Sequence, residues 1–171
     1  MRTLILSSSL SERSRSRVLC REVGQRLEAQ DIDVDFVDLR EIELQPAHRA
    51  VSVSMDQLKA RIQAADNFVI GMGVHCYSIS DSLKMVLDTC CGGMESKFFG
   101  ILCAAGGHKS YLSTMHLTQI CMNEWRMIQL PRVVYAVGKD FVDLAVPPGE
   151  LSERLDQFAG EFARIGAKLL A

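Results

Sequence analysis

The chain has 171 residues, 48% of them hydrophobic, so one domain of ordinary size can bury a substantial core without disulfides or a structural metal. Charged residues make up 23% and the formal net charge is −2, which gives no reason to expect nucleic-acid or membrane binding. No stretch reaches the roughly 20 apolar residues that span a bilayer, and no apolar leader ends in a small-residue cleavage site. We therefore expect a single domain over residues 1–171, located in the cytoplasm.

The first part of the chain alternates short β-branched runs with longer segments of helical spacing. Residues 3–6 predict a strand, and residues 17–29 predict a helix with apolar side chains about one turn apart. Residues 33–39 (DVDFVDL) alternate in character and predict a second strand. Residues 41–54 contain a proline and show no period, so we expect a loop there.

The middle of the chain repeats this alternation. Residues 56–65 predict a helix, and residues 67–72 (NFVIGM) predict a strand that is covered on both faces because it is almost entirely apolar. A further helix is expected to begin after Ser80, a good N-cap residue, and to end at about Cys90 before a glycine pair. Loop residues 73–78 lie between this strand and this helix.

The last part of the chain completes an α/β pattern. Two more strands are predicted at residues 98–104 and 133–137, and two helices at residues 114–128 and 151–170. Five strands with intervening helices predict a doubly wound five-stranded parallel sheet, in the order 2-1-3-4-5, with helices on both faces. Ligands of such sheets bind at the carboxyl ends of the strands, which directs attention to the loops after the first, third and fourth strands.

The six cysteines give no sign of a metal site, because they lack the spacing of zinc or iron–sulfur ligands. In a reducing compartment they are expected to be free thiols. Cys20 and Cys103 lie in apolar segments and are expected in the core. Adjacent Cys90 and Cys91 favour a structural role, because neighbouring residues strain a direct disulfide. Trp125 and the methionines near it are also expected in the core, at helical spacing: Met115, Met122 and Met127.

The loop at residues 7–17 carries six serines between a predicted strand and a predicted helix N-terminus. Free amides and the helix dipole at such a point favour an anion, and small hydroxyl groups can surround a phosphate without bulk. The loop has no glycine, so it is neither a Walker loop nor a dinucleotide-binding turn, and a phosphomonoester suits it better than a pyrophosphate. A solvated turn with good helix caps fits this loop alone equally well.

The loops at residues 73–78 and 104–110 would lie beside it. The second contains Gly106 and Gly107, which allow a backbone to approach a flat ligand closely. The first contains three side chains that would border an aromatic ring: His75, Cys76 and Tyr77. Taken singly, a local hydrogen bond is the favoured interpretation of the histidine, and an inert thiol that of the cysteine.

Together these loops resemble those of the NADPH-dependent FMN reductases, a family of flavodoxin-like proteins, over about residues 2–136. Further support comes from residues 82–88 (SLKMVLD) and from residues 97–100 (KFFG) leading to the glycine pair. The first loop of the family reads G-S-x-R-x-x-S-x-N. Three of its positions are matched or conservatively replaced here, by Ser9, Ser14 and Ser16.

The sequence departs from the family at two points. In the first loop, Ser8 stands for the glycine and Ser11 for the arginine, and Arg13 or Arg15 would compensate for the lost charge. In the second loop, the family's P-E-Y-N appears as GVHC at residues 73–76 and differs at every position, although the spacing to the following Leu-Lys pair is kept.

The resemblance implies a flavodoxin-like fold that binds FMN. It also implies an oxidoreductase that takes hydride from NADPH or NADH onto flavin and passes it to a quinone, flavin or similar small-molecule acceptor. Backbone amides would stabilise charge on the ring, and no side chain need act as a general acid. The residues that it places around the cofactor are Ser9, Ser11, Ser14, Ser16, Gly73, Val74, His75, Cys76, Ala105, Gly106 and Gly107.

The resemblance further implies a homodimer or homotetramer, with residues 55–62 and 114–125 as candidate contact surfaces. Two alternatives remain open because of the altered second loop. One is a non-enzymatic flavin-binding electron carrier or redox sensor, with Cys76 or the pair Cys90-Cys91 as the signalling element. The other is a flavodoxin-like module that has lost FMN.

Overall fold

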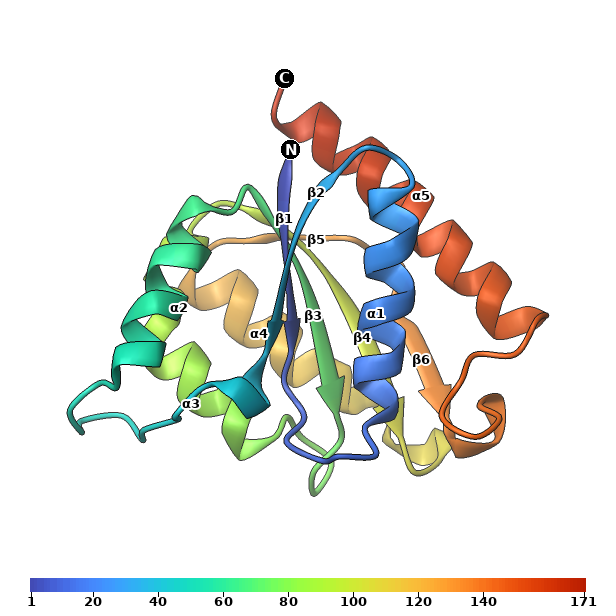
Figure 1. Ribbon diagram of the computed structural model, residues 1–171, viewed down its shortest axis with the longest axis horizontal. Helices are drawn as coiled ribbons and strands as arrows, with labels where there is room; N and C mark the ends of the chain where they lie inside the picture. Colours follow the sequence, from blue (N-terminus) through green and yellow to red (C-terminus); the bar gives the residue numbers. More distant parts are fainter.

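Parallel strands form one twisted sheet in the order β2-β1-β3-β4-β5, with β6 also paired to β4. The computed structural model describes all 171 residues, and Figure 1 shows the strands other than β5 running side by side with their carboxyl ends at the lower edge. This confirms the predicted doubly wound order. The strands are β1 (Arg2–Ser7), β2 (Asp33–Asp38), β3 (Asn67–Gly73), β4 (Phe98–Ala105), β5 (Ile128–Gln129) and β6 (Val134–Val137).

Five α-helices cover the two faces of the sheet. They are α1 (Arg15–Glu28), α2 (Val53–Ala64), α3 (Asp81–Cys90), α4 (Thr114–Glu124) and α5 (Glu150–Leu169). Helices α1 and α5 pack on one face, and α2, α3 and α4 on the other (Figure 1). No helix combines the length and the apolar character needed to cross a bilayer.

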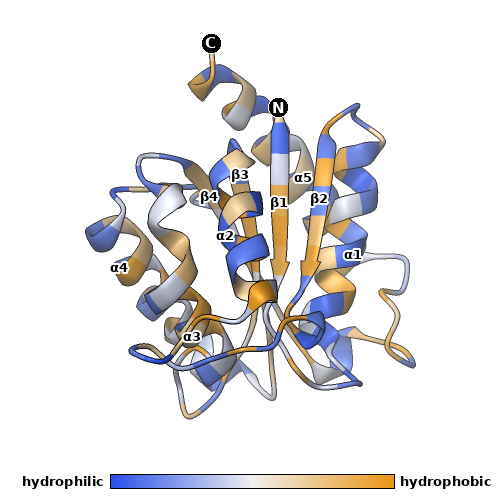
Figure 2. Cartoon of the chain, turned by 60° about the vertical axis from the view of Figure 1, so that its left-hand side comes forward, coloured by the Kyte–Doolittle hydropathy of each residue, from blue (hydrophilic) through white to orange (hydrophobic).

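Each face has its own hydrophobic core, because successive strand residues point to opposite sides. In β1, Leu4 and Leu6 belong to the core under α2, α3 and α4, whereas Ile5 belongs to the core under α1 and α5. Cys20 and Cys103 are both fully buried, as expected. Figure 2 shows the middle of the sheet mainly orange, with blue concentrated on the helices and loops that surround it.

The fifth position of the sheet is divided between two short strands. Phe98 and Phe99 pair with β5, and the second half of β4 pairs with β6. The predicted helix over residues 114–128 is therefore wrong at its end: α4 stops at Glu124, and Arg126 adopts a positive φ of 52°. The chain then turns back so that the Ile128 amide donates to the Lys97 carbonyl at 3.0 Å.

Two more expectations need correction. Met115 and Met122 are exposed rather than in the core, because the buried stripe of α4 runs through Leu117 and Cys121, and both methionines lie beside it. Trp125 and Met127 are buried as expected.

Helix α2 begins at Val53, three residues before the predicted start. The Ser52 hydroxyl accepts the Met55 amide at 3.2 Å and so caps the helix earlier. The apolar residues of the candidate contact stretch 55–62 point into the core, so a contact made there would use the opposite side of the helix.

Candidate functional site

Three loops meet at the carboxyl edge of the sheet and enclose two adjoining cavities of about 540 Å³ and 210 Å³. Val74 and Gly106 line both, so the two form one continuous depression between the loops after β1, β3 and β4. Every residue that the sequence places around a cofactor lines one cavity or the other: Ser9, Ser11, Ser14, Ser16, Gly73, Val74, His75, Cys76, Ala105, Gly106 and Gly107.

The smaller cavity lies at the N-terminus of α1. Ser14 caps this helix, because its hydroxyl accepts the Arg17 amide at 3.1 Å. The amides of Arg15 and Ser16, in the first turn, donate to no other atom of the chain. Free amides, the helix dipole and the serine hydroxyls therefore make this a site suited to a phosphate group.

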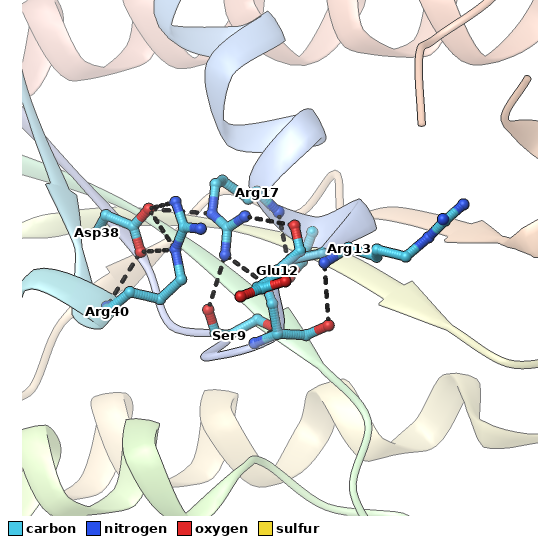
Figure 3. A network of polar contacts seen from close by, with 9 residues as sticks. Ser9, Glu12, Arg13, Arg17, Asp38 and Arg40 are labelled. Carbon is cyan, nitrogen blue, oxygen red and sulfur yellow. Dashed lines mark hydrogen bonds and ion pairs between the residues drawn. The ribbon is translucent and has the colours of Figure 1, made fainter. Parts of the chain in front are cut away.

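Arg17 supports the serine loop from behind. Its buried guanidinium donates to the carbonyls of Ser9 at 3.3 Å, Ser11 at 2.6 Å and Glu12 at 3.2 Å (Figure 3). The C=O and N–H of a trans peptide point in opposite directions. Each carbonyl that accepts a hydrogen bond from Arg17 therefore turns the N–H of the next residue away from the guanidinium. The guanidinium thus fixes the direction of the amides in this loop.

Asp38, at the end of β2, holds Arg17 in place. One carboxylate oxygen lies 3.0 Å from Arg17 Nε, and the side chain also accepts hydrogen bonds from Arg40 (Figure 3). Burial alone would raise the pKa of Asp38, but the hydrogen bonds from Arg40 and the charge of Arg17 outweigh it and hold the pKa below its ordinary value. The anchor is therefore ionised at neutral pH.

Sequence reasoning missed this support. From the sequence alone, Arg17 is expected only as the residue where the serine loop meets the helix, and Asp38 only as part of a strand. Because Ser7 is in register with Asp38 in the parallel pair of β1 and β2, the two strand ends meet directly beneath the loop. The sequence does not show this register, so it gives no signal that Arg17 and Asp38 meet.

The larger cavity is bordered on one side by bare backbone. A Cβ atom placed on Gly106 or Gly107 would meet nothing within 4 Å, and neither amide donates a hydrogen bond within the chain. A flat molecule could therefore contact this backbone directly and receive hydrogen bonds from it.

Tyr135 fixes the position of this glycine turn. Its ring is buried on β6, and its hydroxyl donates to the Gly107 carbonyl at 2.5 Å and lies 2.8 Å from Ser110 Oγ. Tyr111 packs against it edge-on, with ring centroids 5.2 Å apart. Tyr135 was predicted only as a strand residue, since nothing in the sequence shows that the end of β6 reaches the loop after β4.

The other side of the larger cavity is a tight turn after β3. His75 and Ser78 exchange two backbone hydrogen bonds of 2.9 Å and 2.8 Å around Cys76 and Tyr77. The His75 side chain lines the smaller cavity and has no hydrogen-bond partner in the chain, so the expected local hydrogen bond is absent. Cys76 is exposed, and the other five cysteines are buried.

A comparison with models of protein families matches residues 1–142 to the family described as NADPH-dependent FMN reductase. The chain belongs to this family. NADPH-dependent FMN reductases are flavin-dependent oxidoreductases, in agreement with the resemblance that the three loops show. A comparison of the sequence with curated proteins finds no significant match.

Solved structures place this FMN reductase family member among flavodoxin-like proteins. It is similar to an oxidoreductase from Corynebacterium diphtheriae, at 21% identity and a TM-score of 0.80, over 98% of this chain and 97% of that one. An NADH:FMN oxidoreductase in its apo form is 16% identical, with a TM-score of 0.76 over 92% and 88% of the two chains. A flavodoxin from the Archaea is 12% identical, with a TM-score of 0.70 over 98% and 99%. At these identities the likeness establishes the fold.

Proposed function

We propose that the protein is an FMN-dependent NAD(P)H oxidoreductase that passes hydride from NADPH or NADH to bound FMN, and then to a quinone, flavin or similar small acceptor. One observation carries the proposal. The smaller cavity, at the serine-lined N-terminus of α1, is continuous with the larger cavity, which is bordered by the backbone of Gly106 and Gly107, and the chain belongs to the FMN reductase family. When bound, FMN would supply the reversible hydride chemistry that amino-acid side chains lack.

The smaller cavity fits the phosphate of FMN. Ser9, Ser11, Ser14 and Ser16 would donate hydroxyl hydrogen bonds, and the free amides at the start of α1 would add to them. Arg13 and Arg15 also line this cavity. Their positive charge would offset the loss of the family's loop arginine, whose position Ser11 occupies.

The larger cavity fits the planar ring. Residues 73–76 would border one part of it and residues 105–107 another, as their positions in the two cavities support. The unused amides of Gly106 and Gly107 are preorganised donors, which would stabilise negative charge on a ring in this cavity. No side chain is needed as a general acid.

We also propose a cytoplasmic homodimer or homotetramer, following the family. Exposed apolar side chains on α4 and in the turn just before it support a subunit contact around residues 114–125. They are Tyr111, Leu112, Met115 and Met122.

The test is the visible spectrum of the purified protein before and after anaerobic addition of NADPH. We expect a flavin spectrum that bleaches on addition. A flavin spectrum that persists with both NADPH and NADH would contradict the reductase and favour an electron carrier or sensor. A colourless protein that cannot be reconstituted with FMN would contradict both.

A further inference from the structure

A buried chain of serine hydroxyls joins the start of α3 to the loop after β1. The Ser80 hydroxyl caps α3 by accepting the Leu83 amide at 3.2 Å, and it lies 2.8 Å from the Ser82 hydroxyl. The Ser82 hydroxyl donates to the Ser8 carbonyl at 2.7 Å, across 74 residues of sequence. All three serines are at most 2% exposed, so these hydrogen bonds are shielded from water.

The hydroxyl protons fix the direction of this chain. Each serine hydroxyl has one proton to donate. Ser82 uses its proton on the Ser8 carbonyl, so Ser80 must donate to the Ser82 oxygen. The Ser80 oxygen in turn accepts the Leu83 amide. Every link therefore points from α3 toward the Ser8 carbonyl, and hydrogen bonds aligned in one direction strengthen one another.

Ser8 is also held on its other side. Its amide and its hydroxyl both donate to the Gly71 carbonyl, at 3.1 Å and 2.7 Å. Gly71 belongs to β3, so Ser8 is fixed between this central strand and α3. The family's loop has a glycine at this position, which offers no hydroxyl, so the attachment through the side chain is a feature of this chain.

The consequence of this arrangement falls on the next amide, that of Ser9. As in the peptides held by Arg17, an N–H that follows a fixed carbonyl points the opposite way. Because the Ser8 carbonyl points toward Ser82, the Ser9 N–H points away from α3. That N–H donates to no atom of the chain, and Ser9 lines the smaller cavity. A free donor held in one direction at this point favours an anion.

We propose that Ser82 is a positioning residue of the phosphate site, and that the hydroxyl chain through it sets the preference of the cavity for phosphorylated over unphosphorylated flavin. Ser82 lines neither cavity, so it acts through the Ser8 carbonyl and the Ser9 amide. The inference rests on the proposed function, because the phosphate is that of the proposed cofactor. Arg17 holds the loop from the side of α1, and Ser82 holds it from the side of α3.

The test is to titrate the whole chain, freed of flavin, with FMN and with riboflavin, which lacks the phosphate. Ser82→Ala removes one buried oxygen atom and adds no bulk. It should weaken FMN binding by roughly 3- to 10-fold, the effect of one hydrogen bond, and leave riboflavin binding unchanged. The ratio of the two affinities should therefore fall by the same factor. Riboflavin binding also shows that the variant is folded.

Thr89→Ala is the matched control on the same helix. The Thr89 hydroxyl donates to the Met85 carbonyl at 2.6 Å, within α3, and contacts no loop of the site. This variant loses a hydroxyl hydrogen bond of similar length and should bind both flavins as the wild type does.

An equal loss of FMN and riboflavin affinity in Ser82→Ala would overturn the inference, because it would show that the serine only supports the fold. Unchanged FMN affinity in this variant would also overturn it, as would a wild type that binds riboflavin as tightly as FMN. In these three cases the proposed function would stand. A wild type that binds no FMN would overturn the proposed function itself, and the inference with it.

Discussion

Replacing Arg17 with methionine would remove the support of the phosphate loop while keeping a long apolar side chain. The change removes hydrogen bonds to three carbonyls and an ion pair of 3.0 Å with Asp38, whose carboxylate is 2% exposed. Removing one partner of a buried ion pair costs about 3–5 kcal/mol. The carboxylate keeps its hydrogen bonds from Arg40, so we expect the lower limit, about 3 kcal/mol. For a domain of this size that corresponds to a melting temperature lower by about 6–12 °C.

Urea unfolding of the apoprotein measures this loss, with the single tryptophan, Trp125, as the fluorescent probe. FMN titration should show that affinity falls as well, because the loop amides would no longer be held in one direction. Arg132→Met is the control, because it breaks an ion pair with Glu161 that is far more exposed to water than the pair of Arg17 with Asp38. This variant should change the stability little and the FMN affinity not at all. If Arg17→Met keeps the stability and the FMN affinity of the wild type, the support assigned to Arg17 is wrong.

Three further results are expected. The pKa of Asp38 in the folded state is lower than its unfolded value of about 3.9. The contribution of Asp38 to stability is therefore complete above the unfolded pKa and is lost as the pH falls through the folded pKa. Measuring the free energy of unfolding at decreasing pH should show this loss in the wild type but not in Asp38→Asn. Tyr135→Phe should weaken FMN binding by about 3- to 10-fold, because the glycine turn loses the hydrogen bonds of the Tyr135 hydroxyl with the Gly107 carbonyl and the Ser110 hydroxyl, whereas Tyr111→Phe, which loses no hydrogen bond, should leave binding unchanged. Replacing Ser9 and Ser14 with glutamate should abolish FMN retention by placing negative charge at the phosphate site; unchanged flavin content would contradict that placement.

The sheet and its strand order could be predicted because each buried strand is a short apolar run, too short to be a buried helix. NFVIGM at residues 67–72 and FFGILCA at residues 98–104 are such runs, and both are covered on two faces. Strand β5 could not be predicted. It has two residues, and its pairing depends on a turn at Arg126, where the sequence has neither of the residues that usually adopt a positive φ, glycine or asparagine.

The location of the candidate site could be predicted from the sequence, but the residues that hold its loops in place could not. Loops after parallel strands lie at one edge, so residues 9–16, 73–76 and 105–107 were expected to lie near one another, and the structure places them together. Arg17 and Tyr135 act from elements beside those loops, through contacts that depend on strand register and on how far a side chain reaches. No periodic pattern contains that information.

The distribution of thiols gives the protein a native attachment point for a spectroscopic label. Burial raises the pKa of Cys20, Cys103 and Cys121 to about 12, and it also raises that of Cys90 and Cys91, so these five remain protonated and sterically shielded. Cys76 alone is exposed, and it lies at the rim of the larger cavity. A thiol-reactive dye added to the folded wild-type protein would therefore attach beside the place where a ligand enters, and its emission would report occupancy without any engineered cysteine.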